Sequence, residues 1–325
     1  MKLCRTLCLF CAVTATALAA AEALVNAPVN APPVWRAAPP IAAAEKAPVI
    51  AATRAGNRIV AVGDYGIVIL SDDGKRFRQA LKVPTRAVLT SVFFLDDRHG
   101  WAAGHDGTVL ASSDGGESWQ LLREEPAKDR VLLSIRFENL LRGFAVGQFG
   151  LMLATEDGGK TWHERRLVDG DMGDKHLMHI FAGGGRYFVA AEAGTLFHSE
   201  DGGRRWKAVQ TSNKGSFWTG LVLADGGILA AGMRGHIYRS DDHGMTWKEV
   251  PSGTQQSITA IAQRSDGTLR LIGNAGTDLF SNDQGRSFAA RNREDKFNHA
   301  NLTALAAGPQ GDVLFTLGGV VAEDR

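Results

Sequence analysis

Short apolar runs alternate with polar turns along most of the chain. The runs are rich in Val, Leu, Phe and Ala, and the turns between them carry Gly and Asp. Runs of this kind are typical of β-strands, whereas a helix of ordinary length needs roughly ten or more residues. The 38 glycines among 325 residues agree with this, because glycine favours turns and weakens helix interiors. The pattern predicts an all-β protein.

One polar turn occurs six times. It begins with Ser or Thr, has an Asp two residues later and then a Gly, and ends on Trp or Phe, as in "SSDGGESW" before Gln120. The six aspartates are Asp73, Asp114, Asp157, Asp201, Asp242 and Asp283. The closing aromatic residues Phe77, Trp119, Trp162, Trp206, Trp247 and Phe288 lie 41 to 44 residues apart. A catalytic loop is expected once, so six copies indicate a structural turn in which Asp accepts backbone N–H groups and the aromatic ring packs on a neighbour.

A glycine marker runs in phase with this turn. A Gly stands five residues before each copy, and in five units another Gly lies three residues earlier; in the fourth unit Ala191 takes that place. The residues between the paired positions are predicted to lie at one height on one face of the molecule. They include His105, Gln148, Phe149, Met233, Arg234, Asn274 and Ala275.

Four short strands in a unit of this length match one blade of a β-propeller. The glycine marker continues to Gly319, where a seventh unit begins that the chain does not complete, and Trp35 stands one repeat before Phe77. We predict a seven-bladed β-propeller with four-stranded blades over residues 49–325, closed by N- and C-terminal strands. In this scheme residues near Trp35 supply the outer strand of the last blade, since an open sheet edge leaves backbone groups unpaired.

The N-terminal 21 residues have the pattern of a cleaved signal peptide. Lys2 and Arg5 precede the apolar run Leu7–Leu18, and the small residues Ala19–Ala21 follow it. A retained anchor and a lipoprotein are the weaker alternatives. Residues 22–48 are rich in Pro and Ala, which favours an extended leader. We expect an exported, soluble protein in a periplasm or a lumen-like compartment.

Composition narrows the chemistry further. All three cysteines lie in the segment expected to be removed, which excludes a disulfide or a cysteine metal site in the mature chain. A formal net charge of +1 argues against nucleic acid as a partner. The sequence therefore indicates no cofactor and no metal site. The loop Asp169–Asp174 holds three aspartates without calcium-loop spacing, so a weak cation there stays open.

Basic residues gather in two places. They are Arg76, Arg78, Lys82 and Arg86 around the first repeated turn, and Arg234 and Arg239 in the fifth unit. Such charges either keep a surface solvated or offer it to an acidic peptide or to anionic headgroups. We take these six residues as candidate partner-binding residues.

The six turns are similar to the Asp boxes of BNR-type propellers, which include sialidases and non-enzymatic binding proteins. The fuller unit "GWAAGHDGTVLASSDGGESW", with its relative "GFAVGQFGLMLATEDGGKTW", more specifically resembles the photosystem II stability/assembly factor-like propellers, over residues 49–321. That resemblance implies an exported scaffold without an active site, which binds a newly made membrane subunit during assembly. It names no partner for this chain. We expect a monomer that takes no small-molecule substrate.

The alternative is a BNR-type glycosidase of the sialidase kind. Such an enzyme needs an arginine cluster for a carboxylate, a Tyr/Glu nucleophile pair and an acidic residue on the inner rim. Tyr65 falls in a turn, Tyr187 and Tyr238 fall in mid-blade strands, and only Arg54 and Arg136 fall on expected inner strands. His176 and His179 are expected to point to opposite sides of their strand, which disfavours a shared metal. We therefore expect no catalytic residues.

Overall fold

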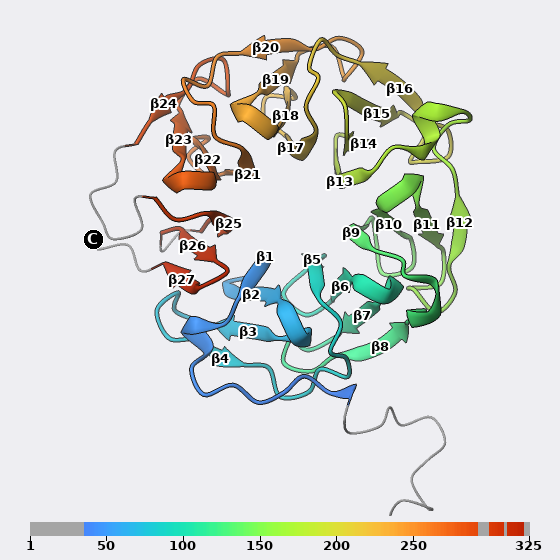
Figure 1. The fold of residues 1–325 in the computed structure, drawn as a ribbon, viewed down its shortest axis with the longest axis vertical. Coiled ribbons are helices and arrows are strands. Elements are labelled where there is room, and N and C mark those ends of the chain that lie inside the picture. The colour runs from blue at the N-terminus through green and yellow to red at the C-terminus, as the bar shows by residue number, and fades with distance from the viewer. Residues whose placement is uncertain (1–35, 292–298, 309–310, 322–325) are drawn as a thin grey trace, which may run out of the picture. The chain divides into compact units, whose positions relative to one another are not determined.

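Seven antiparallel sheets stand around a common axis like the blades of a propeller (Figure 1). The computed structural model describes residues 36–291, 299–308 and 311–321, and the propeller belongs to one compact unit, Ala38–Arg325. Six sheets have four strands, and the seventh has three strands among the described residues. The first strand of each blade lies nearest the axis (Figure 1). The predicted seven-bladed all-β propeller is confirmed.

The strands of the first four blades follow the chain in order. Blade 1 contains β1 (Val49–Ala55), β2 (Arg58–Gly63), β3 (Val68–Ser71) and β4 (Arg78–Gln79). Blade 2 contains β5 (Leu89–Phe94), β6 (Gly100–Gly104), β7 (Val109–Ser112) and β8 (Gln120–Arg123). Blade 3 contains β9 (Leu132–Phe137), β10 (Gly143–Gly147), β11 (Met152–Thr155) and β12 (His163–Arg165). Blade 4 contains β13 (Leu177–Gly183), β14 (Arg186–Ala191), β15 (Thr195–Ser199) and β16 (Lys207–Gln210).

The last three blades repeat this order. Blade 5 contains β17 (Phe217–Val222), β18 (Ile228–Gly232), β19 (Ile237–Ser240) and β20 (Lys248–Val250). Blade 6 contains β21 (Ile258–Gln263), β22 (Leu269–Gly273), β23 (Asp278–Ser281) and β24 (Ala289–Ala290), and blade 7 contains β25 (Leu302–Ala306), β26 (Val313–Thr316) and β27 (Gly319–Val321). Short 3-10 turns are η2 (Ala44–Lys46), η3 (Asp64–Gly66), η4 (His105–Gly107), η5 (Pro126–Lys128), η6 (Gln148–Gly150), η7 (Asp171–Asp174), η8 (Met233–Gly235) and η9 (Asn274–Gly276). No helix in the described ranges is long and apolar enough to cross a membrane.

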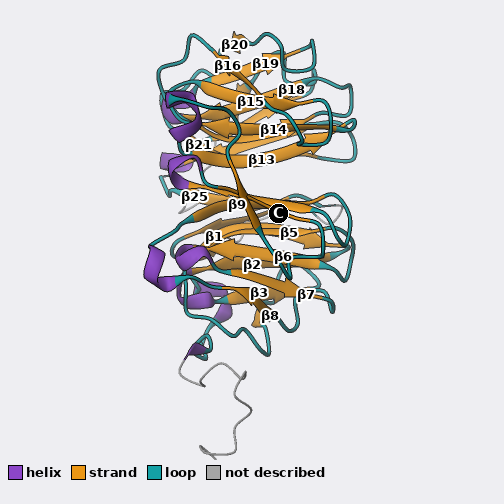
Figure 2. Cartoon of the chain, turned by 90° about the vertical axis from the view of Figure 1, so that its right-hand side faces the viewer, coloured by secondary structure: helices purple, strands orange, loops and turns teal. Residues whose placement is uncertain are grey.

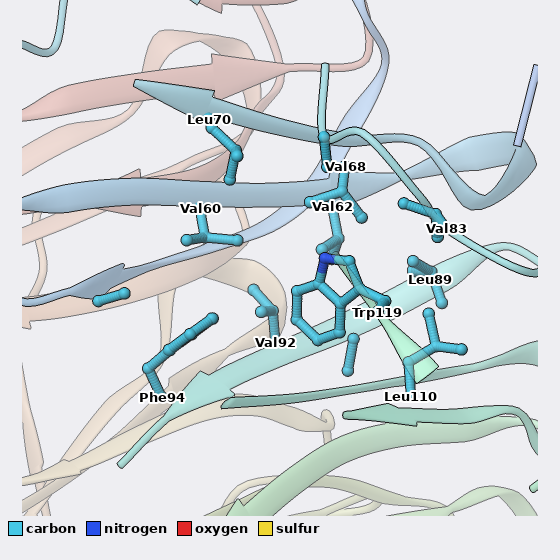
Figure 3. Packing of buried hydrophobic residues seen from close by; sticks show 13 residues of the cluster. Val60, Val62, Val68, Leu70, Val83, Leu89, Val92, Phe94, Leu110 and Trp119 are labelled. Atoms are coloured by element: carbon cyan, nitrogen blue, oxygen red, sulfur yellow. The ribbon is translucent and has the colours of Figure 1, made fainter. Parts of the chain in front are cut away.

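The core lies between the blades. The second strands β6, β10, β18 and β22 are buried at every residue, whereas the outer strands β12 and β24 are exposed at every residue. Figure 3 shows one such core, where the indole of Trp119 lies among Val60, Val62 and Val68 of blade 1. Trp119 is 3% exposed. The aromatic residue that closes an Asp box thus packs against the preceding blade.

Side chains of the innermost strands join neighbouring blades. The second residue of the strand donates its hydroxyl to the carbonyl of the first residue of the next inner strand: Thr90 to Leu132 (2.5 Å), Thr259 to Leu302 (2.7 Å) and Thr303 to Val49 (2.7 Å). The inner strand is the edge of its sheet, so these bonds satisfy carbonyls that the ladder leaves free. The third pair joins blade 7 to blade 1 and closes the ring.

The segment before β1 crosses the same seam. Ala38 N donates to Val83 O (2.9 Å), and Gln79 exchanges hydrogen bonds with Pro39 O (2.8 Å) and Ile41 N (3.0 Å). Ala44 packs in a cluster with residues of blades 1 and 7. Residues 36–48 contain no strand. The segment 1–21 and Trp35 lie outside the described residues, so the signal peptide and the closing outer strand stay predictions.

Candidate functional site

The two faces of the ring carry different turns. The strands of a blade are antiparallel, so the turns between second and third strands share one face, and the Asp boxes between third and fourth strands lie on the other. We call these the glycine-turn face and the box face. Figure 2 shows the short helices gathered on one side of the ring when it is seen edge-on.

Each of six glycine turns holds a non-glycine residue in the left-handed backbone region. These residues are Tyr65 (φ 53°), Asp106 (φ 56°), Phe149 (φ 54°), Ala193 (φ 53°), Arg234 (φ 57°) and Ala275 (φ 50°). This conformation costs a non-glycine residue about 1 to 2 kcal/mol. The backbone is the same in these six turns while the side chains differ in size and charge. The fold therefore does not dictate these side chains, which makes them the candidate functional residues.

Two of these residues expose large aromatic rings. The side chain of Phe149 is 75% exposed and that of Tyr65 is 59% exposed. In blade 7, Leu317 stands between the second and third strands and is 62% exposed. These three exposed apolar side chains are candidates for contact with a partner.

Two contacts and a steric constraint fix the turn that carries Phe149. The N–H of Phe149 donates to His176 Nδ1 (2.9 Å), and the two rings meet edge to face with centroids 4.6 Å apart. The glycine after Phe149 leaves no room for a side chain, because a Cβ at Gly150 would lie 1.8 Å from the carbonyl oxygen of Gly173. The aromatic ring is thus presented on a fixed backbone.

Arg234 borders a concave polar surface on the glycine-turn face. A cavity of about 720 Å³ is lined by Arg234, Gly235, His236, Glu249, Pro251, Ser252, Gly253, Thr254 and Gln255. Glu249 Oε1 lies 2.6 Å from His236 Nδ1 at this cavity. Among the six basic residues predicted from the sequence, Arg234 is the one that also belongs to the left-handed residues of the glycine turns.

Four predicted residues lie along blade 1 and the loop after it. The guanidinium of Arg78 donates twice to Glu117 (2.6 Å each), and that of Arg76 pairs with Asp73 (2.9 Å) while its side chain is 92% exposed. Lys82 and Arg86 are exposed. The pairing of Arg76 and Arg78 leaves less free charge here than the sequence suggests.

Arg239 is buried, although the sequence predicted a residue at the surface. It is 4% exposed and its Nη2 donates to Asp225 (3.0 Å) and Asp241 (2.6 Å). Its Nη1 donates to the carbonyl of Gln284, the residue after the box aspartate of blade 6. The same carbonyl position in other boxes receives donors from the preceding blade, namely Arg58 to Gly115 (3.4 Å), Trp101 to Gly158 (3.4 Å) and Arg142 to Gly202. Arg239 is a link between blades 5 and 6.

The box aspartates organise their own turns. Asp114 Oδ1 accepts from the backbone N–H of Ser118 (3.0 Å) and the hydroxyl of Ser112 (2.8 Å), and the other boxes repeat this. In blade 3 the Thr161 hydroxyl and backbone N–H hold the pKa of Asp157 down to about 2. The carboxylates are therefore ionised turn anchors, which is the role expected of the box.

Residues weighed for enzymatic or metal chemistry have structural partners. Tyr187 and Tyr238 are 4% and 2% exposed. The Arg54 guanidinium donates to Ala307 O (2.6 Å), and that of Arg136 lies 5.2 Å from the ring centroid of Phe93. Over the described ranges no three His, Cys, Asp or Glu side chains are placed to hold a metal ion. Asp174 of the acidic loop pairs with Arg166.

The ring, the repeated box and the variable glycine-turn face define an Asp-box β-propeller. Residues 122–270 match a family model described as photosynthesis system II assembly factor YCF48. The photosystem II assembly protein Ycf48 of Synechococcus sp. (strain JA-3-3Ab) is 39% identical over 132 residues, which cover 40% of this chain and 39% of the relative. The match to Ycf48 of Thermosynechococcus vestitus (strain NIES-2133 / IAM M-273 / BP-1) is 36% over 42 residues, 13% of this chain and 12% of the relative. Over residues 122–270 the chain is thus similar to the Ycf48 photosystem II assembly factor family, which is the resemblance that the repeats indicated.

Solved structures agree on the fold. A structure titled YCF48 bound to D1 peptide superposes with a TM-score of 0.69 at 20% identity and covers 87% of this chain and 96% of that one. YCF48 from Cyanidioschyzon merolae gives 0.64 at 17% identity, with 88% and 96% covered. A streptogramin B lyase gives 0.71 at 12% identity, with 86% and 94% covered. Identities this low concern the propeller architecture, which enzymes and binding proteins share.

Proposed function

We propose that this chain is an exported, monomeric, non-enzymatic scaffold that holds a segment of a membrane or envelope protein during assembly, on its glycine-turn face. The observation that carries the proposal is the set of left-handed residues, whose backbone is constant and whose side chains vary. A relative of similar fold was solved with a D1 peptide, which supports a polypeptide as the class of ligand.

The exposed rings supply the binding energy in this proposal. Burying an aromatic side chain such as Phe149 contributes roughly 1.5 to 3 kcal/mol, and Tyr and Trp are frequent binding hot spots. The bond from Phe149 N–H to His176 Nδ1 fixes the turn before the partner arrives, so less freedom is lost on binding. Arg234 and its cavity add a polar contact on blade 5. Arg76, Arg78, Lys82 and Arg86 form a second candidate contact at the rim.

Affinity capture from the native host tests the proposal. Wild type is compared with the double variant Tyr65→Ala/Phe149→Ala, and captured proteins are identified by mass spectrometry. The control is Leu140→Ala/Leu141→Ala, which removes side chains that are 48% and 61% exposed on the box face. We expect the first variant to lose a membrane or envelope protein that the wild type and the control retain. Equal capture by all three proteins would reject the glycine-turn face as the site.

Two further measurements complete the test. Charge reversal, Arg76→Glu/Arg78→Glu, decides whether the rim residues contribute, because undiminished capture removes them from the proposal. Hydrolysis of a fluorogenic sialoside by the purified protein would instead favour the glycosidase alternative. No contact in the described residues favours that alternative, since the tyrosines of blades 4 and 5 are buried.

A further inference from the structure

Neighbouring inner strands are joined by an acceptor at one repeated position. The third residue of the strand accepts the N–H of the fourth residue of the next inner strand. Ser91 Oγ accepts from Ile135 (3.2 Å) and Ser134 Oγ from Ile180 (3.2 Å). In blade 4 the acceptor is His179 Nδ1, which receives the N–H of Gly220 in blade 5 (3.1 Å). Blade 4 thus uses an imidazole where blades 2 and 3 use a hydroxyl.

A second repeated position shows the same substitution. The residue just before an inner strand accepts the N–H of the left-handed residue in the preceding blade. Ser257 Oγ accepts from Arg234 (3.4 Å), and Asn301 Oδ1 accepts from Ala275 (3.0 Å). In blade 4 this residue is His176, whose Nδ1 accepts from Phe149 (2.9 Å). Blade 4 therefore contacts both neighbours through imidazole acceptors.

An imidazole accepts at Nδ1 only while that nitrogen is unprotonated. Protonation converts the acceptor into a donor, which then faces another N–H group and repels it. Hydroxyl and amide oxygens do not titrate, so the equivalent contacts of other blades keep their acceptors in acid.

We propose that blade 4 is an acid-sensitive element of the ring, which releases the N–H of Gly220 in blade 5 when His179 is protonated. The release of this backbone group is independent of the proposed function.

The surroundings of His179 set the direction of the effect. Its ring stacks on Phe181 with centroids 5.6 Å apart, and the charged group that faces it is the Arg136 guanidinium of β9. Burial, followed by the Arg136 charge, lowers the pKa of His179 from 6.5 to about 4. The folded state therefore prefers the neutral ring. Its contribution to stability is complete above pH 6.5 and is lost as the pH falls from 6.5 towards 4.

His176 lies at the surface of the same blade among charged groups. Its backbone N–H donates to the Glu192 carboxylate (3.0 Å), and its sequence neighbours are Lys175 and Asp174, the latter paired with Arg166. From blade 3 the side chain that meets its ring is Phe149. The contact of His176 with blade 3 is thus the bond from the Phe149 N–H and the edge-to-face ring contact.

Residue-resolved hydrogen exchange on the full chain tests the proposal, with protection factors compared at about pH 7.5 and about pH 4. The amide of Gly220 reports the contact with His179, and those of Ile135 and Ala275 report the hydroxyl and amide contacts. From the lowered pKa of His179, the protection factor of Gly220 is expected to fall on the order of 100-fold between the two pH values. The two reference amides are expected to change by less than about threefold. A Gly220 amide that follows the Ile135 amide at both pH values overturns the proposal.

A matched variant uses the acceptor of the other blades. His179→Ser copies Ser91 and Ser134. It is expected to keep protection at neutral pH and to remove the acid response at the Gly220 amide, whereas His163→Asn, at an exposed position, leaves the response intact. An acid response at Gly220 that survives His179→Ser overturns the proposal.

Discussion

The two faces of the ring repeat the same period in opposite ways. On the box face the side chains repeat, since each described box aspartate accepts from the hydroxyl of the residue two positions before it. On the glycine-turn face the backbone repeats and the side chains differ, from Ala193 to Phe149. Positions where all blades agree therefore hold the fold, and positions where they differ are free to serve recognition. Each prediction below tests one side of this contrast.

The largest effect is expected from the aromatic residue of an Asp box. Trp119→Ala removes an indole from the core between blades 1 and 2 and is expected to lower the free energy of unfolding by about 3 to 5 kcal/mol. Urea denaturation followed by tryptophan fluorescence measures it. Trp119→Phe is the matched control, because Phe77 and Phe288 close two other boxes, and it is expected to lose much less. Loss of partner capture by the folded Trp119→Ala protein at unchanged stability would break the contrast.

The second largest loss of stability is expected when acid protonates the aspartates of the boxes. The Thr161 hydroxyl lowers the pKa of Asp157 to about 2, and the Ser287 hydroxyl chiefly lowers that of Asp283. Since these pKa values lie below the ordinary value of about 3.9, their stabilisation is present above pH 4 and is lost as the pH falls towards 2. Urea denaturation at several pH values should show a steeper decline below about pH 4 for the wild type than for Asp157→Asn. Equal slopes would show that the boxes are not ionised anchors.

The smallest change in stability is expected on the glycine-turn face. Phe149→Gly relieves a left-handed residue but adds freedom to the unfolded chain, so the free energy of unfolding should change by less than about 1 kcal/mol. Gly116→Ala on the box face is the contrasting variant, because its φ is 84° and the new Cβ would lie 3.2 Å from Val60. It is expected to destabilise by about 1 to 3 kcal/mol. Thermal unfolding measures the stability of both variants. A Phe149→Gly protein that is less stable than Gly116→Ala would contradict the expected order.

The period of the box and of the glycine marker was sufficient to predict blades, strands and the closing turn of each blade. Both signals are local, since Asp and Gly act within a few residues of their own position. We expected His176 and His179 on opposite sides of one strand. In the structure His176 precedes β13 and contacts blade 3, whereas His179 lies within β13 and contacts blade 5.

The contacts between blades could not be predicted from the sequence. Arg239 has the composition of a surface residue, and its burial depends on the Gln284 carbonyl 45 positions away. The left-handed backbone of Tyr65 and Phe149 was not predicted for a different reason, because neither Tyr nor Phe is a residue type that commonly adopts positive φ. The useful signal was the glycine spacing, read together with large apolar residues between the glycines in some blades and small ones in others.

Site-specific photo-crosslinking in the native host tests the central claim most directly. A benzophenone amino acid is placed at Phe149 on the glycine-turn face or at Leu141 on the box face, both of which are exposed. We expect the probe at position 149 to crosslink one membrane or envelope polypeptide and the probe at position 141 to leave that polypeptide uncrosslinked. Crosslinking of the same polypeptide from position 141 and not from position 149 would contradict the account.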